Sequence, residues 1–296
     1  MTTDRRTRAL NSLYGLALGD ALGSQFFVPD NRDAWQRRQL PPGPWQWTDD
    51  AEMACSVFAV LRQAGRVDQD RLAASFATHH DFDRGYGPSM NRLLRLVREG
   101  GSWRELATDL FDGQGSWGNG AAMRVAPLGA WFAGDPDEAG RQAALSAEVT
   151  HTHPDGVAGA IAVAVAASLA APPTPPSPAD FLDQVLRRVP PGRVRDGVLA
   201  ARELAHVPSS ATAAHELGNG SHTGAHDTVP FTLWAAARHL DDYEQAFWAT
   251  ASAGGDVDTT CAIVGGIVAA RVGVEGLPWS WRAACESLPE WAGAES

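Results

Sequence analysis

Cysteine is scarce in this sequence, whose 296 residues include only Cys55, Cys261 and Cys285. None of these has the close spacing of a metal-binding pair, and their odd number argues against a disulfide framework. The scarcity excludes a thiolate metal site and is typical of proteins with reduced thiols. Long apolar runs are lacking as well. The most apolar stretch, residues 157–171, is rich in alanine and shorter than the ~20 residues that a membrane span needs, so it predicts a buried helix.

Basic residues are outnumbered, with 24 Lys and Arg against 35 Asp and Glu and a net charge of −11. This balance disfavours nucleic acid as a partner, because affinity for a phosphate backbone is built largely from Lys and Arg contacts. A small anionic ligand is still allowed, since a bound divalent cation can dominate the local field. The polar start, Met1 to Arg6, is not followed by the apolar block of a signal peptide. We expect a cytoplasmic monomer with no membrane contact.

Strand-like alternation of apolar and polar residues is also hard to find. Ala-rich stretches of helix-forming composition are common instead, and they predict an all-α fold. These stretches are residues 71–79, 138–150, 156–171 and 198–205. The Pro-rich segment 172–178 is the best candidate for a linker. Because two acidic motifs on opposite sides of it suggest a shared site, we interpret it as a surface loop and residues 1–296 as a single domain.

These two motifs, about two hundred residues apart, combine carboxylates with hydroxyls: Thr48-Asp49-Asp50 and Gly254-Gly255-Asp256-Val257-Asp258-Thr259. Each precedes an apolar run and so predicts a helix start, where a Thr or Asp commonly acts as the N-cap. A cap needs one acceptor, whereas each motif supplies two carboxylates, which repel each other unless a cation or a proton neutralises them. Such oxygen donors suit Mg²⁺ or Mn²⁺ rather than zinc or copper. The alternatives are two ordinary caps or, if the fold brings the motifs together, one metal site, which we favour.

Three further segments have the composition of ligand-binding loops. The glycine-rich turn Gly118-Asn119-Gly120 either presents backbone N–H groups to a phosphate or is only a tight connection. His151, in His151-Thr152-His153-Pro154, is either a ligand contact or part of the segment that caps the next helix. Gly85-Tyr86-Gly87 is either a plain turn or a loop with an aromatic ring over a ligand.

In this order the motifs resemble the ADP-ribosylglycohydrolase family, which includes the dinitrogenase reductase-activating glycohydrolase and the ADP-ribosylarginine hydrolases. The resemblance extends over nearly the whole chain. The matching segments are Gly15-Leu16-Ala17-Leu18-Gly19-Asp20-Ala21-Leu22-Gly23, Trp47-Thr48-Asp49-Asp50, Arg84-Gly85-Tyr86-Gly87, Gly118-Asn119-Gly120-x-x-Met123-Arg124, Thr150-His151-x-His153-Pro154, Asp227-Thr228-Val229-Pro230 and Gly255-Asp256-Val257-Asp258-Thr259.

The resemblance implies an orthogonal helical bundle with a dinuclear Mg²⁺ or Mn²⁺ centre. The implied metal ligands are Thr48, Asp49, Asp50, Asp256, Asp258 and Thr259. The implied residues that bind ADP-ribose are Gly118, Asn119, Gly120, Ala121, Met123, His151, Tyr86 and Gly87. Trp117 and Tyr86 are the candidate aromatic partners of the adenine.

Two positions depart from the family pattern. Phe27 stands where many members have a glutamate that in some of them assists the metal centre, so no role for that glutamate transfers to this chain. An acid from elsewhere, such as Asp30, is a candidate substitute. Val257 stands where a threonine is common, which alters hydrogen bonding around the metal more than metal binding itself.

The implied function is metal-dependent hydrolysis of the glycosidic bond between ADP-ribose and a modified protein side chain. Asp50, and next Asp258, are the candidates for accepting the proton of the attacking water, in a reaction with an oxocarbenium-like transition state. The His-x-His-Pro variant resembles the arginine-directed branch, so we expect arginine as the acceptor. A serine, small-metabolite or nucleic-acid acceptor is the enzymatic alternative. Phe27 leaves open a different class, a non-catalytic ADP-ribose-binding or immunity-type protein.

Overall fold

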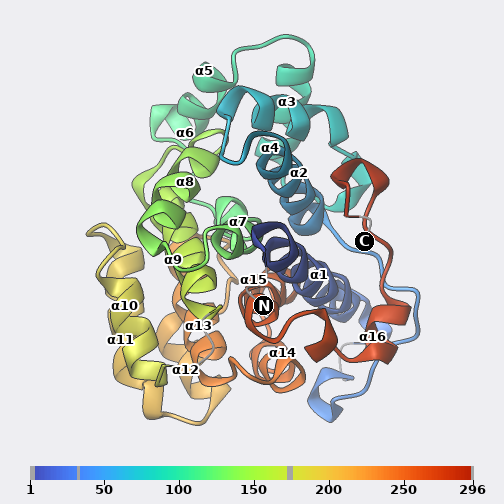
Figure 1. The fold of residues 1–296 in the computed structure, drawn as a ribbon, viewed down its shortest axis with the longest axis vertical. Helices are drawn as coiled ribbons and strands as arrows, with labels where there is room; N and C mark the ends of the chain where they lie inside the picture. Colours follow the sequence, from blue (N-terminus) through green and yellow to red (C-terminus); the bar gives the residue numbers. More distant parts are fainter. Residues whose placement is uncertain (1–3, 32–33, 172–175, 295–296) are drawn as a thin grey trace.

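The computed structural model describes residues 4–31, 34–171 and 176–294 (Figure 1). These residues form sixteen α-helices and contain no β-strand, only two isolated bridges. The helices are α1 (Arg5–Ser24), α2 (Asp49–Ala64), α3 (Gln69–His79), α4 (Pro88–Arg98), α5 (Trp103–Thr108), α6 (Leu110–Gly113), α7 (Ala126–Trp131), α8 (Pro136–Glu148), α9 (Pro154–Ala170), α10 (Pro178–Leu186), α11 (Arg193–Glu203), α12 (Ser210–Leu217), α13 (Ala225–Arg238), α14 (Tyr243–Ala251), α15 (Val257–Val272) and α16 (Trp279–Ala284). The all-α prediction is confirmed.

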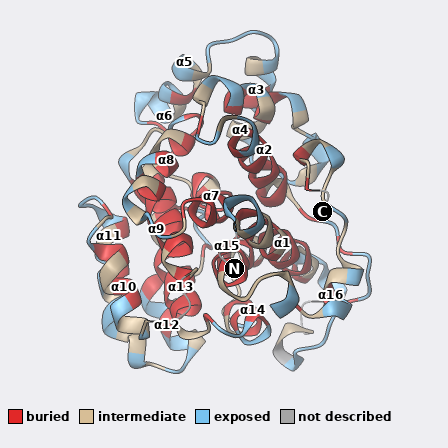
Figure 2. Cartoon of the chain, in the orientation of Figure 1, coloured by how far each residue is buried: buried red, intermediate tan, exposed pale blue. Residues whose placement is uncertain are grey.

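The Ala-rich stretches predicted as helices coincide with α3, α8, α9 and α11. Figure 2 shows α9 and α15 buried over most of their length, as predicted for residues 157–171. No described helix combines the length and the apolarity of a membrane-spanning segment. Of the predicted Pro-rich loop, residues 172–175 lie outside the described residues, and Pro178 opens α10. Helices from both sides of this segment contribute to one buried core, while the single-domain assignment stays a prediction.

A stripe of glycines on α1 allows this helix to pack unusually close to α15 at the centre of the molecule (Figure 1). Gly15, Gly19 and Gly23 are spaced by four residues and therefore lie on one face of the helix. A Cβ atom at Gly19 would lie 2.2 Å from the carbonyl oxygen of Cys261, and one at Gly15 would lie 2.1 Å from the Cβ atom of Ala269. Any larger residue would push the two helices apart.

The close packing of α1 on α15 determines where the acidic residues meet. Asp20 follows Gly19 directly, and a Cβ atom at Gly23 would lie 2.8 Å from the Cα atom of Asp258 at the start of α15. The helices α7, α9 and α13 also contact α15. The N-terminal ends of α2, α4 and α15 line a common cavity together with the loop that precedes α7.

Candidate metal centre and substrate cavity

The cavity at these helix ends has a volume of about 390 Å³, and most of the predicted site residues line it. Those are Asp49, Asp50, Gly87, Gly118, Asn119, Gly120, Met123, His151, Asp256, Asp258 and Thr259. Thr48, Tyr86 and Ala121 were also predicted, but they lie outside the lining.

Three buried or half-buried aspartates cluster beside this cavity, and two of them, Asp50 and Asp258, line it. Asp20, Asp50 and Asp258 each offer one carboxylate oxygen, and these oxygens all lie within 4.8 Å of one another. Asp50 belongs to the first turn of α2 and Asp258 to the first turn of α15. The fold therefore brings carboxylates from the two acidic motifs together, as the metal-site hypothesis requires, and adds a third from α1.

Asp20 is the site residue that sequence reasoning missed. Its side chain is fully buried and receives hydrogen bonds from the backbone N–H and the hydroxyl of Thr48, both at 2.8 Å, and from the N–H of Ala51 at 3.1 Å. Asp20 thereby fixes the start of α2 against α1. The available signal was a single acid within an otherwise apolar and glycine-rich helical stretch, residues 15–23.

The two acidic motifs differ in how far they act as helix caps. The Thr48 hydroxyl accepts a hydrogen bond from the N–H of Asp50 at 3.5 Å and so caps α2. Asp256 occupies the N-cap position of α15, but its side chain makes no capping hydrogen bond. One of its carboxylate oxygens instead accepts from the side-chain amide of Asn119 at 2.7 Å. The capping alternative therefore holds for Thr48 and not for Asp256.

The crowded carboxylates resist ionisation when no cation is present. Burial, reinforced by the charges of Asp20 and Asp258, raises the pKa of Asp50 well above its usual value. Burial and the neighbouring Asp20 likewise raise the pKa of Asp49 to about 8. One oxygen of Asp50, Oδ1, is buried and has no hydrogen-bond partner among the described residues. An unpaired buried oxygen is costly, and a divalent cation would pair it, so these oxygen donors fit Mg²⁺ or Mn²⁺.

The glycine-rich loop forms one wall of the cavity. Gly118 donates its N–H to the Ser116 hydroxyl at 3.2 Å, and Asn119 donates its N–H to the carbonyl of Thr223 at 2.9 Å. The N–H of Gly120 makes no hydrogen bond to a described residue, so it is the loop donor that a ligand could use. A Cβ atom at Gly120 would lie 2.9 Å from the His151 ring, and the loop therefore needs glycine there.

The two histidines before α9 have different surroundings. His153 caps α9, because its Nδ1 accepts the N–H of Asp155 at 3.1 Å. His151 is 4% exposed and lines the cavity. The capping interpretation therefore holds for His153, and a ligand contact of His151 stays a prediction.

The aromatic residues singled out in the sequence, Tyr86, Trp117 and Phe27, lie outside the lining of the cavity. Tyr86 is 5% exposed and donates its hydroxyl to Glu52 at 2.7 Å, so its ring packs away from the cavity. Trp117 is half-buried beside Phe111, with the ring centroids 4.8 Å apart. Phe27 is 48% exposed, and neither it nor Asp30 lines the cavity. The acid that joins Asp50 and Asp258 from outside the two acidic motifs is therefore Asp20, and not Asp30, the candidate substitute for the glutamate missing at Phe27.

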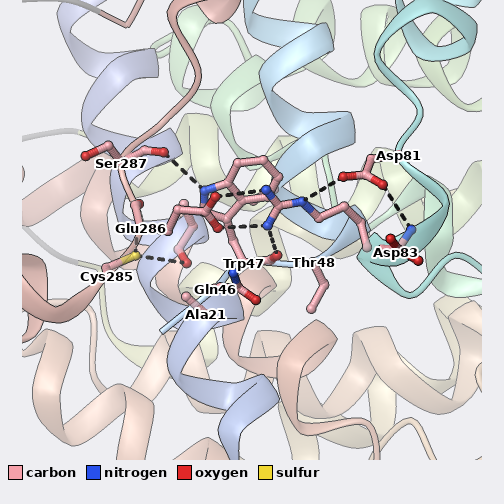
Figure 3. A network of polar contacts seen from close by, with 12 residues as sticks. Ala21, Gln46, Trp47, Thr48, Asp81, Asp83, Cys285, Glu286 and Ser287 are labelled. Carbon is pink, nitrogen blue, oxygen red and sulfur yellow. Dashed lines mark hydrogen bonds and ion pairs between the residues drawn. The ribbon is translucent and has the colours of Figure 1, made fainter. Parts of the chain in front are cut away.

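A polar network supports the segment that leads into α2 (Figure 3). The Arg84 guanidinium makes two hydrogen bonds of 2.8 Å to the Glu286 carboxylate. It also lies 3.5 Å from the centroid of the Trp47 ring and donates to the Trp47 carbonyl at 2.9 Å. The Trp47 indole in turn donates to the carbonyl of Ser287 at 3.3 Å. The segment that follows α16 thus anchors the residue preceding Thr48.

The chain is similar to several known proteins over nearly its whole length. It is 30% identical to the ADP-ribosylhydrolase ARH3 of Bos taurus, in an alignment that covers 96% of this chain and 90% of that protein. It is also 30% identical to the protein YegU of Escherichia coli, with 95% and 92% covered. A solved structure described as an ADP-ribosylglycohydrolase-related protein complex has a TM-score of 0.68 at 24% identity, with 98% and 96% covered. This last likeness concerns the fold alone.

The chain also matches a protein family over nearly its whole length. Residues 1–295 match the ADP-ribosylglycohydrolase family, in agreement with the resemblance of the seven motifs and with the acidic cluster beside the cavity. This chain therefore belongs to the ADP-ribosylglycohydrolase family.

Proposed function

We propose that this chain is a divalent-metal-dependent hydrolase that releases ADP-ribose from a modified protein side chain. The observation that carries the proposal is the cluster of Asp20, Asp50 and Asp258 beside a cavity walled by the Gly118–Gly120 loop and His151. Membership in the family supports an ADP-ribosyl group as the ligand of this cavity.

The residues placed to hold the metal are carboxylates and hydroxyls from three helix regions. We assign this role to Asp20, Thr48, Asp49, Asp50, Asp256, Asp258 and Thr259, and Mg²⁺ or Mn²⁺ suits such donors. When bound, two cations would stabilise charge on the substrate oxygens and lower the pKa of a bound water.

The protein's own residues would move the proton and hold the substrate. Asp50 is the first candidate for accepting the proton of the attacking water, because it lines the cavity and burial raises the pKa of its carboxyl above the usual value. Asp258 is second, because one of its oxygens already accepts the N–H of Thr259 at 2.7 Å. The N–H of Gly120 and the ring of His151 would contact the diphosphate or ribose. Trp117 packs against Phe111 outside the cavity lining, so it is given no contact with the adenine in this proposal.

Arginine is the acceptor that we propose to test first, on the strength of the His151-Thr152-His153-Pro154 segment, and serine is the second. The name of the ARH3 relatives, ADP-ribosylhydrolase, supports hydrolysis of an ADP-ribosyl linkage and does not specify the acceptor. The non-catalytic alternative rested on Phe27. Because this side chain is exposed and outside the cavity lining, its position gives that alternative no support.

The test measures free ADP-ribose released from arginine-modified and from serine-modified protein, with Mg²⁺ or Mn²⁺ and again with excess chelator. We expect metal-dependent release from one of the two substrates. The variant Asp258→Asn should abolish release, whereas Asp137→Asn, at a 69% exposed side chain paired with Arg188, should leave it unchanged. Equal release with chelator, or full activity of Asp258→Asn, would refute the assignment of the metal site.

A further inference from the structure

A chain of hydrogen bonds behind the cavity wall ends on His151. Arg124 donates from one guanidinium nitrogen to the hydroxyl of Thr150 at 2.9 Å, and this hydroxyl lies 2.7 Å from Nδ1 of His151. Arg124 and Thr150 are fully buried. The same Arg124 side chain also donates to the backbone carbonyls of Gly120 and Ser146, so it connects the glycine-rich loop to the segment of His151.

Counting donors and acceptors fixes the direction of this chain. Arginine has only donors, so the Thr150 oxygen must accept from Arg124. The hydroxyl then has one hydrogen to donate, and among the described residues its other partner is Nδ1 of His151. If Nδ1 carried the proton instead, the buried Thr150 hydrogen would have no acceptor, which is costly. Nδ1 is therefore the acceptor, and the neutral ring carries its proton on Nε2.

The free ring nitrogen faces the substrate cavity. A Cβ atom at Gly120 would lie 3.0 Å from Nε2, and one at Gly118 would lie 3.4 Å from it, so Nε2 sits beside the loop that walls the cavity. His151 lines this cavity, and Nε2 has no protein partner among the described residues. A ligand oxygen could accept its hydrogen there.

We propose that Arg124 and Thr150 are positioning residues that hold His151 as a fixed Nε2–H donor toward an oxygen of the ADP-ribosyl group. This inference rests on the proposed function for the identity of the ligand, but the tautomer itself does not depend on it. His151 then acts as a neutral hydrogen-bond donor and not as a general base, whose nitrogen would have to be free to accept a proton.

The electrostatics of the pocket agree with this role. Burial, with a smaller contribution from the charge of Arg124, lowers the pKa of His151 to about 3. Burial also lowers the pKa of Arg124 to about 9, which leaves the guanidinium charged at neutral pH. The ring is therefore uncharged wherever the enzyme would work, and its function depends on which nitrogen holds the single proton.

The tautomer can be measured without ligand, from the ¹⁵N chemical shifts of the His151 ring in the full-length protein. We expect a proton on Nε2 in the wild type from pH 6 to 8. Thr150→Val keeps the shape but removes the hydroxyl, and it should produce a mixture of tautomers, whereas Thr150→Ser should retain the wild-type shifts. A proton on Nδ1 in the wild type, or unchanged shifts in Thr150→Val, would overturn the inference.

Calorimetric measurement of ADP-ribose binding tests the positioning of His151 by Arg124 and Thr150 independently of the proposed function. Thr150→Val should weaken binding about three- to tenfold, the value of one hydrogen bond, and Thr150→Ser should not. As a second pair, His151→Gln, whose amide nitrogen can occupy the place of Nε2, should bind more tightly than His151→Asn. If Thr150→Val bound as tightly as Thr150→Ser, and His151→Asn as tightly as His151→Gln, the proposed positioning of His151 would be refuted. No binding by the wild type would refute the proposed function, while the ring shifts would still decide the tautomer.

Discussion

Replacing Asp50 by asparagine should stabilise the metal-free protein and remove its response to divalent cations. The substitution keeps the shape of the side chain but takes one charge from the cluster with Asp20 and Asp258. An amide nitrogen could also donate to a neighbouring carboxylate, so that a repulsive contact becomes a hydrogen bond. Asp50 is thus expected to lower the stability of the metal-free protein and to be required for binding of the divalent cation.

The magnitude follows from the separation of the carboxylates. Two unit charges within 4.8 Å of each other repel by about 3 kcal/mol or more at an effective dielectric constant of ~20. Uptake of a proton by one carboxylate relieves part of this repulsion, so we expect a gain of about 1–3 kcal/mol in the free energy of unfolding. For a chain of this size, that gain corresponds to a rise of about 2–6 °C in the Tm.

The assay is thermal unfolding of both proteins, in chelator and in increasing Mg²⁺ or Mn²⁺. With the cation at one hundred times its Kd, the wild type should gain about 2.7 kcal/mol, and Asp50→Asn should gain little. The control Asp137→Asn removes a charge from an exposed ion pair, which is worth about 0–1 kcal/mol, and should respond to the cation like the wild type. A lower Tm of Asp50→Asn in chelator, or an undiminished response to the cation, would refute this reasoning.

Three further predictions test the surroundings of the cluster. In chelator, the free energy of unfolding should fall as the pH rises from 6.5 to 8.5, by up to about 1.4 kcal/mol per pH unit. The reason is that burial raises the pKa of Asp49 from 3.8 to about 8, so the folded state holds a proton that the unfolded chain has already lost. Asp50, whose pKa burial also raises, contributes in the same direction, so Asp49→Asn should make the slope shallower in chemical unfolding experiments without removing it. Gly19→Ala should lower the free energy of unfolding by about 1–3 kcal/mol, because its Cβ atom would lie 2.2 Å from the Cys261 carbonyl. Gly140→Ala on α8, whose nearest contacts would be 3.5 Å away, should be neutral or stabilising in the same measurement. Asn119→Ala, which frees Asp256 from its 2.7 Å hydrogen bond, should weaken Mn²⁺ binding about 10- to 100-fold in calorimetric titration, and an unchanged Kd would contradict the role given to Asn119.

Local signals in the sequence were sufficient to predict the all-α class, several of the helices and the positions of the acidic motifs at helix starts. Thr48 and Asp256 occupy the N-cap positions of α2 and α15, because a helix start followed by an apolar run is encoded within a few neighbouring positions. The prediction that Asp50 and Asp258 share a site also succeeded, since clustered carboxylates far apart in the chain need a common neutralising partner.

Features that depend on long-range packing could not be predicted from neighbouring residues. Asp20 joins the cluster only because Gly19 lets α1 approach α15 closely, a contact between the two ends of the chain. The sequence of the Tyr86 loop likewise does not say that its hydroxyl turns inward to Glu52. For Asn119, which lines the cavity, the sequence also does not say that its side-chain amide donates to Asp256. Sequence reasoning identified the loops, whereas the direction of each side chain is decided by the partners that the fold supplies.

The number of acids alone does not explain why this cluster calls for a cation. Helix starts supply N–H donors that can satisfy carboxylates, and two helices begin here. Three of these donors go to the neighbouring aspartates, since Asp20 accepts the N–H groups of Thr48 and Ala51 and Asp258 accepts that of Thr259. Oδ1 of Asp50 is left with no donor among the described residues. A metal ion would resolve this shortage of donors at a buried oxygen of the acidic cluster, and metal binding is thereby linked to the stability of the core.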